Sequence, residues 1–231
     1  PAYSATLREH EQGLERLLLS RADADAGVVS EYAALQRDTY DARRKYLGSA
    51  ALAATQLRSQ DDAILFEKSE EIHELLQENV DAAEAVCGDG YDGLAAASRE
   101  RAGAKKRALV LIDPPYQMGS DTDRSMKLLR HLRKHWRAAR VALWYPASPQ
   151  SQANNRRLFD LAATFDCDSL RVEFAVDPSQ SRRLAASGFL LVQPPYRLED
   201  QLCDVVLPDL ADALHESATI RTTTIPAATT R

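Results

Sequence analysis

The chain has 231 residues, of which 45% are hydrophobic and 27% charged, and its formal net charge at pH 7 is −5. This composition predicts one large folded domain with a small attachment, and it excludes a disordered chain, a collagen-like repeat and a disulfide-stapled miniprotein. Cys87, Cys167 and Cys203 lie far apart, which indicates a reducing compartment and argues against structural zinc. No stretch approaches the roughly 18 apolar residues of a membrane span.

The first part of the chain has the apolar periodicity of helices. Apolar residues at helical spacing predict a helix over residues 5–45, with a polar connector at 20–27. Tyr46-Leu47-Gly48-Ser49 interrupts the pattern, and a second helix is expected over 51–57. Residues 1–50 are therefore predicted to form a helical subdomain.

Strands and helices alternate along the next part of the chain. Strands are predicted at 63–66, 85–87, 107–112, 141–145, 170–176 and 188–192, and helices at 72–80, 124–138 and 153–165. This alternation predicts a doubly wound α/β sheet within residues 51–216. Strand 107–112 is apolar after Arg107, so we expect both of its faces to be buried.

The sequence also predicts how the last two strands pair and whether the C-terminal tail is ordered. Strands 170–176 and 188–192 have only a loop between them, so they are predicted to pair antiparallel. The Thr-rich tail, residues 217–231, shows no core-forming pattern and is expected to be disordered.

The strongest functional signal is Asp113-Pro114-Pro115-Tyr116, at the carboxyl end of an apolar strand, where open α/β sheets bind ligands. The Asp113 carboxylate and a backbone carbonyl, fixed by the prolines, can accept both N–H bonds of an amino group conjugated with a ring. The Tyr116 ring can stack on a flipped base. This chemistry suits methyl transfer to nitrogen without a metal. The alternative is a Pro-Pro turn that only ends a strand.

A second segment, Gln193-Pro194-Pro195-Tyr196, follows strand 188–192. Its glutamine amide could also accept an N–H bond but carries no charge. We interpret it as a structural or substrate-flanking turn, and it remains the rival for the catalytic position.

Two acidic residues lie where a nucleoside cofactor would need them. Glu67 ends a strand, where a carboxylate can bind both ribose hydroxyls, and Asp89 could accept the amino group of an adenine ring. Either could instead be a surface acid at a helix N-terminus. The run from Gly88 to Gly93 matches a dinucleotide-binding pattern by its letters, but a weak strand precedes it and no suitable acid follows.

Helix 124–138 carries a basic stripe in this acidic protein. Lys127, Arg130, Lys134 and Arg137 share one face, and a phosphate backbone could lie along them unless they are only a solvated face. Further basic residues could extend the patch: Arg133, Arg140, Arg182, Arg183 and Lys105-Lys106-Arg107. His131 and His135 are spaced one helical turn apart, but without a third ligand a metal site is not expected.

From about residue 46 to residue 215 the chain resembles the bacterial enzymes that methylate the N6 amino group of one adenine in large-subunit (23S-type) ribosomal RNA. The resemblance rests on an ordered series: Tyr46-Leu47-Gly48-Ser49, Glu67, Asp89-Gly90-Tyr91, Asp113-Pro114-Pro115-Tyr116, Ala142-Leu143-Trp144-Tyr145-Pro146, Ser187-Gly188 and Pro194-Pro195-Tyr196. The Asp-Pro-Pro-Tyr motif alone is shared with many amino-methyltransferases, including DNA enzymes, whereas the whole ordered series is far more specific.

The resemblance implies a Rossmann-like fold that uses S-adenosylmethionine, with a helical insertion near residues 5–45. It implies catalysis by Asp113 with Pro114 and Tyr116, and cofactor binding by Glu67, Asp89, Gly90 and Asp113. The expected partner is protein-free or early-assembly ribosomal RNA. We expect a monomer without metal or membrane, in the cytoplasm or an organelle matrix.

The chain departs from the family pattern at its start. Family members begin with a segment rich in His and Lys and a first strand that ends in a Gly-rich cofactor loop, whereas residues 1–6 contain no glycine. That strand would lie between strands 63–66 and 107–112, so its absence is expected to leave two strand edges unpaired. The chain is interpreted as a fragment of a complete enzyme or as a degenerate relative. Two alternatives remain open: a non-catalytic RNA-binding or ribosome-assembly protein, and a DNA adenine-N6 methyltransferase.

Overall fold

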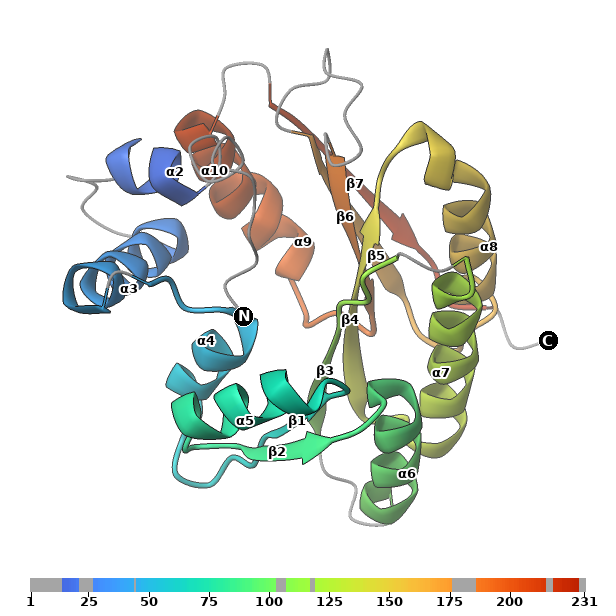
Figure 1. Cartoon of the computed structure of the whole chain (residues 1–231). Coiled ribbons are helices and arrows are strands. Elements are labelled where there is room, and N and C mark those ends of the chain that lie inside the picture. The colour runs from blue at the N-terminus through green and yellow to red at the C-terminus, as the bar shows by residue number, and fades with distance from the viewer. Residues whose placement is uncertain are drawn as a thin grey trace. The chain divides into compact units, whose positions relative to one another are not determined.

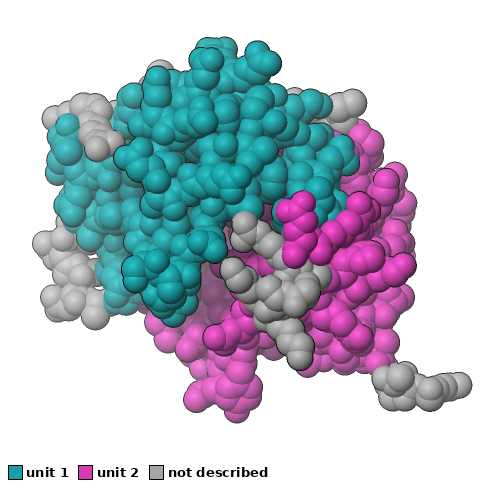
Figure 2. All heavy atoms as spheres, turned by 90° about the horizontal axis from the view of Figure 1, so that it is seen from below, with its two compact units in different colours: residues 1–97 teal, residues 98–231 magenta. Residues whose placement is uncertain are grey.

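The computed structural model describes residues 14–20, 27–43, 45–102, 107–116, 119–175, 186–214 and 218–228. The chain divides into two compact units, residues 1–97 and 98–231, which Figure 2 colours separately. Strands and helices alternate as predicted, and the expected α/β fold is confirmed. The predicted domain boundary after residue 50 does not coincide with this division and stays a prediction.

The described part of the first unit includes the helices α2 (Leu14–Ser20), α3 (Val28–Arg43) and α4 (Ser49–Thr55). The polar connector predicted at 20–27 separates α2 from α3, while residues 5–13 of the predicted helix lie outside the described residues. The buried side chain of Gln36, on α3, accepts from Leu47 N at 2.8 Å and donates to Leu47 O at 3.0 Å. These two bonds attach the segment before α4 to helix α3.

The same unit contains a parallel pair of strands, β1 (Ile64–Glu67) and β2 (Glu84–Cys87), joined by α5 (Glu70–Asn79). Ser69 caps α5, because its hydroxyl accepts from Ile72 N. Helix α6 (Gly90–Ala102) follows β2 and crosses the division between the units. In register, Glu67 lies beside Cys87, so both strands end at the same edge.

The second unit contains a five-stranded sheet in the order β3-β4-β6-β5-β7 (Figure 1). Its strands are β3 (Ala108–Ile112), β4 (Ala139–Pro146), β5 (Ser169–Ala175), β6 (Ala186–Val192) and β7 (Thr219–Ile225). Strands β3 and β4 are parallel, and all other neighbours are antiparallel. The predicted antiparallel pairing of β5 with β6 is confirmed.

Helices cover both faces of this sheet. Helices α7 (Asp121–His135) and α8 (Gln152–Ala162) lie on one side, and α9 (Leu198–Gln201) and α10 (Leu207–Leu214) on the other (Figure 1). A short 3-10 turn (Pro149–Ser151) precedes α8, and a π-helical turn (Leu202–Val206) joins α9 to α10. Leu129 and Leu132 of α7 are almost fully buried, which places the core under that helix.

The Thr-rich tail is not disordered where it is described, so that prediction was wrong. Residues Thr219–Ile225 form β7, which pairs along its length with β5. Ile220 packs against the cluster of Leu170, Val172 and Leu207. All residues of β7 except Arg221 are β-branched, and such residues favour a strand at the edge of an existing sheet.

The prediction that β3 is buried on both faces was also wrong. Val110 and Ile112 are buried, whereas Leu109 is 78% exposed and Leu111 is 51% exposed. Within the described residues, β3 pairs only with β4 and β1 pairs only with β2. A strand at the end of a sheet with one face covered alternates between buried and exposed side chains.

Candidate active site

The Asp113-Pro114-Pro115-Tyr116 segment leaves the sheet at the carboxyl end of β3. Ile112 lies beside Leu143 of β4, so the motif begins at the level of Trp144. Pro114 is buried, and Asp113 is on the surface. Partial desolvation by the surrounding protein nevertheless raises the pKa of the Asp113 carboxyl. The residue predicted to hold an amino group therefore lies at the ligand-binding edge of a parallel strand pair.

Tyr116 has an unusual backbone conformation, with φ at 49°. Its hydroxyl donates to the carbonyl oxygen of Trp144 at 2.8 Å, and the two rings are tilted by 56° with centroids 5.6 Å apart. The left-handed conformation costs a bulky residue about 1–2 kcal/mol, while a neutral hydrogen bond contributes about 1 kcal/mol and an aromatic pair about 0.5–1.5 kcal/mol. The two contacts to Trp144 are thus of the size needed to hold Tyr116 in place.

The rival motif leaves the sheet in the opposite direction. Strand β6 is antiparallel to β4, and its last residue, Val192, lies beside Val141 near the start of β4. Gln193 therefore continues away from the edge where Asp113 lies. Its φ is 58°, its amide oxygen accepts from Arg133 Nη1 at 2.7 Å, and its N–H donates to Asp168 O at 2.9 Å. These bonds support a structural role for this turn.

Glu67 and Asp89 lie together at the carboxyl edge of the β1–β2 pair. Glu67 Oε1 accepts from Ser69 N at 2.8 Å, and Asp89 Oδ1 accepts from Tyr91 N at 3.0 Å. Lys68 Nζ is 4.0 Å from Asp89 Oδ2. Both carboxylates are thus fixed by their own backbone, and their chemistry fits a nucleoside, because carboxylates accept from ribose hydroxyls and from the adenine amino group.

Gly93 allows α6 to pack closely on β1. A β-carbon on Gly93 would overlap the ring of Phe66, and one on Gly90 would lie 3.5 Å from Phe66 Cβ. Gly93, the last glycine of the dinucleotide-like pattern, therefore has a structural cause within this unit.

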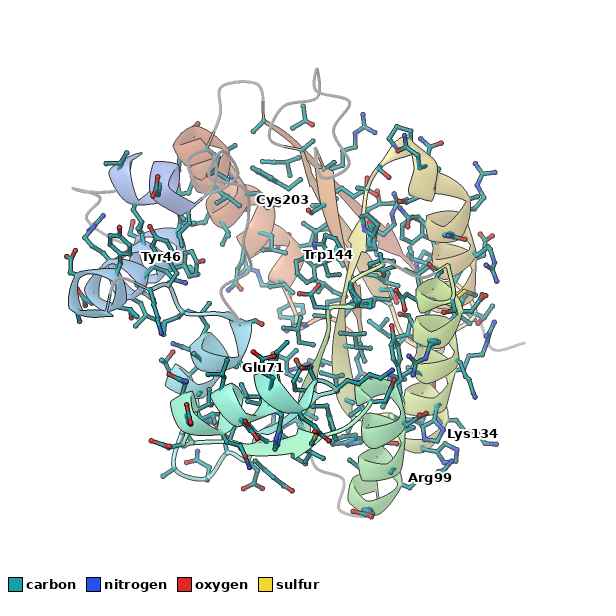
Figure 3. All side chains as sticks on the ribbon, viewed as in Figure 1. Tyr46, Glu71, Arg99, Lys134, Trp144 and Cys203 are labelled. Carbon is teal, nitrogen blue, oxygen red and sulfur yellow. The ribbon has the colours of Figure 1, made fainter. Side chains whose placement is uncertain are left out.

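The basic stripe on α7 is only partly available. Lys127, Arg130 and Lys134 are exposed, and Figure 3 labels Lys134 near the end of the helix. Arg137, predicted to belong to the stripe, forms an ion pair with Asp166. Arg140 is exposed on β4, whereas Lys105, Lys106, Arg182 and Arg183 lie outside the described residues.

Arg133 has a different role from that of its basic neighbours. Its side chain is 9% exposed, and it donates to Gln193 Oε1, to Asp166 Oδ1 and to the carbonyl of Arg137. It therefore joins the end of α7 to the end of β6. Its position on the buried side of an amphipathic helix was the only sequence signal for this role.

The rings of His131 and His135 are tilted by 34° with centroids 4.4 Å apart, and His131 Nε2 is 3.0 Å from the hydroxyl of the buried Ser98. Across the described ranges, no group of three His, Cys, Asp or Glu side chains is placed to hold a metal ion. No helix in the part of the chain that the structure describes is long and apolar enough to cross a bilayer.

Comparison with known proteins identifies close relatives along most of the chain. Residues 3–224 match the family model described as Ribosomal RNA large subunit methyltransferase D, RlmJ. A Haemophilus influenzae protein named Ribosomal RNA large subunit methyltransferase J is 32% identical over 213 residues, 89% of this chain and 73% of the relative. The Escherichia coli protein of the same name is 33% identical over 164 residues, 71% of this chain and 58% of the relative.

A solved structure shows the same fold. A protein of Legionella pneumophila superimposes with a TM-score of 0.78 at 19% identity, covering 98% of this chain and 84% of that protein. At this identity the similarity establishes the α/β architecture and leaves the chemistry to the residues described above.

Proposed function

The chain belongs to the family described as Ribosomal RNA large subunit methyltransferase D, RlmJ, and from this premise we propose that it methylates large-subunit ribosomal RNA at the N6 amino group of an adenine. The observation that carries the proposal is Asp113, a carboxylate with a raised pKa at the carboxyl end of β3, followed by two prolines and a tyrosine. Family membership supports ribosomal RNA as the substrate. The motif supports the amino group of a base as the acceptor.

In this proposal Asp113 and a backbone carbonyl of the motif accept the two N–H bonds of adenine N6. The lone pair of that nitrogen is delocalised into the ring, and fixed acceptors favour a geometry in which it can react. The nitrogen would take a methyl group from a sulfonium donor, which would leave as a neutral thioether, and one N–H proton would be released to water. Tyr116 stacks on the base after it leaves the RNA stack.

The methyl donor is proposed to be S-adenosylmethionine, whose sulfonium supplies an activated methyl group. Glu67 would hold its ribose hydroxyls, and Asp89 with the adjacent Gly90 its adenine end. Both acids fit this task, because each lies at the end of a parallel strand and each carboxylate is already oriented by a backbone N–H. Their supporting bonds leave acceptor capacity on a carboxylate, which has about four lone-pair sites.

The RNA backbone is proposed to lie along Lys127, Arg130 and Lys134, which are exposed on one side of α7. Arg137 would contribute less, because it is held in an ion pair with Asp166. Flexible exposed lysines and arginines position a nucleic acid through its phosphates without reading the base sequence.

The test is methyl transfer by the full-length protein to protein-free ribosomal RNA, followed by digestion and identification of the labelled nucleoside. We expect N6-methyladenine in large-subunit RNA. A label on another atom, or on DNA in a competition between the two polymers, would show that the proposal is wrong. Calorimetry with S-adenosylmethionine is the companion measurement, because a full-length protein that binds RNA but not the cofactor would be a non-catalytic RNA-binding protein.

A further inference from the structure

We infer that Trp144 is a positioning residue. It holds Tyr116 in its left-handed backbone conformation and thereby orients the Tyr116 ring on which the substrate base stacks. This inference rests on the proposed function for its substrate, but the contact that it invokes lies entirely within the second unit. Trp144 is labelled on β4 in Figure 3.

The contact between the two residues has a backbone part and a side-chain part. The Trp144 carbonyl accepts the Tyr116 hydroxyl at 2.8 Å, and the indole meets the phenol ring at 5.6 Å between centroids. Register places Trp144 at the level where the motif begins, because Ile112 lies beside Leu143. Two attachments at one level of the sheet restrict both the tip and the plane of the Tyr116 ring.

Trp144 is not explained by the packing of the main core. Its neighbour Tyr145 is fully buried on the face covered by α8, where it meets Phe159. Side chains alternate along a strand, so Trp144 lies on the other face. There it is opposite Phe189 of β6, which is 37% exposed. A half-buried tryptophan on the more open face, in contact with a residue of the motif, is placed to orient that residue.

The conformation of Tyr116 gives the contact its importance. A φ of 49° is disfavoured for a tyrosine, so the residue should relax when the interactions that hold it are lost. The Tyr116 ring would then still lie near Asp113, but it would less often have the orientation needed to stack on the base. Loss of Trp144 should therefore lower the rate of transfer more than it lowers RNA or cofactor affinity.

The contact itself is tested by fluorescence, without any activity. The chain has two tryptophans, so a Trp136→Phe background leaves Trp144 as the only emitter. We expect Tyr116→Ala in this background to shift the emission to longer wavelength, because the indole loses a packed ring. Tyr196→Ala is the matched control, since Tyr196 follows the other Pro-Pro pair and is 92% exposed. An identical, unshifted spectrum for both variants would overturn the inference.

The role is tested by a double-mutant cycle in single-turnover methyl transfer by the full-length protein. Trp144→Leu should lower the rate roughly three- to tenfold, the range of an aromatic contact, and Trp144→Phe should recover part of that loss. The same Trp144→Leu change in a Tyr116→Ala background should cost nothing further, because Trp144 acts through Tyr116. If the losses in transfer rate are additive, Trp144 has a purely structural role. The same conclusion follows if the rate falls only in variants whose thermal unfolding midpoint also falls.

The two proposals fail in different ways. If the labelled nucleoside is not N6-methyladenosine, or if Asp113→Ala leaves the rate unchanged, the proposed function is wrong, whatever the fluorescence shows. If N6-methyladenine forms and depends on Asp113 but the Trp144 and Tyr116 losses add, only the positioning role is wrong. If the Trp144→Leu variant does not fold, a double-mutant cycle can be made from Trp144→Phe and Tyr116→Phe. Both positions then keep an aromatic ring.

Discussion

Gly188 lies so close to Tyr145 that a β-carbon on the glycine would overlap the tyrosine ring. The two residues are paired across β4 and β6. Tyr145 donates to Glu173 Oε1 at 3.0 Å, and Arg171 donates to the same oxygen at 2.9 Å. Burial and the Glu173 carboxylate raise the pKa of Tyr145 well above its usual range, so this phenol stays protonated and acts as a donor. The pair thus packs a polar cluster under α8.

Gly188→Ala should therefore destabilise the protein. Overpacking of a filled site costs about 1–3 kcal/mol, and the ring cannot swing away without breaking its bond to Glu173. Urea unfolding followed by circular dichroism would measure the loss. Gly119→Ala is the control, because none of the described residues comes within 4 Å of a β-carbon there. Equal stability of the two variants would contradict the packing argument.

Asp113→Ala should lower single-turnover methyl transfer a hundredfold to a thousandfold, the typical effect of losing one preorganised group of about 3 kcal/mol. Cofactor affinity should persist, because it is assigned mainly to Glu67 and Asp89. Gln193→Ala should cost much less in rate, since its amide is bonded to Arg133 at the other end of β6. A larger loss for Gln193→Ala, in variants shown to be folded, would move the catalytic site to the other motif.

The raised pKa of Asp113 predicts a pH dependence of activity. The amino group needs a charged acceptor, so transfer should fall as pH decreases through a pKa higher than that of an ordinary aspartate. The acid limb of the single-turnover profile reports this pKa. An acid limb at the value of a free aspartate would indicate that the carboxyl is fully hydrated.

Stability should show the opposite trend with pH. Because burial raises the folded-state pKa of Asp113, its protonated form favours folding. That contribution is fully present below the unfolded-state pKa and is lost as pH rises through the folded-state value. Asp113→Asn should remove this part of the pH dependence, which can be measured as the difference in unfolding free energy between the two proteins across the acid range.

Charge reversal of Lys127, Arg130 and Lys134 to glutamate should weaken RNA binding and flatten its salt dependence. Each lost phosphate contact reduces the slope of log K against log salt by about one. The same reversal at the exposed Arg58, Arg197 and Arg221 changes the net charge equally and serves as the control. Filter binding over a salt series would decide, and equal slopes for the two triple variants would show that the stripe is only solvated.

Local signals in the sequence predicted most of the strands and helices, and the misses have physical causes. Helix α7 begins at Asp121, three residues before the predicted start, because Asp121 and Asp123 favour the first turn of a helix. The apolar letters of β3 predicted burial on both faces, but burial depends on which elements cover a strand. Strand β7 was missed because its threonines were interpreted as a polar tail, although a run of β-branched residues also favours an edge strand.

The candidate site was predictable only as a set of residues in the right order. The strand context located Asp113, Glu67 and Asp89 at strand ends, where the structure also has them. Their roles remain predictions. The partners that orient the site come from distant positions: Trp144 contacts Tyr116 from another strand, and Arg133 reaches Gln193 across 60 residues of sequence. No local pattern records such pairs, because they form only when the sheet does.

Helix α7 connects the two ends of the second unit's sheet. It begins eight residues after Asp113, and Arg133 attaches its last turn to the end of β6. A helix of 15 residues is about 22 Å long, and one fixed in this way has little freedom to slide. If RNA lies along its basic side, the fixed helix determines the distance between a bound phosphate and the reacting base. The protein would then select its nucleotide partly by measuring along the strand.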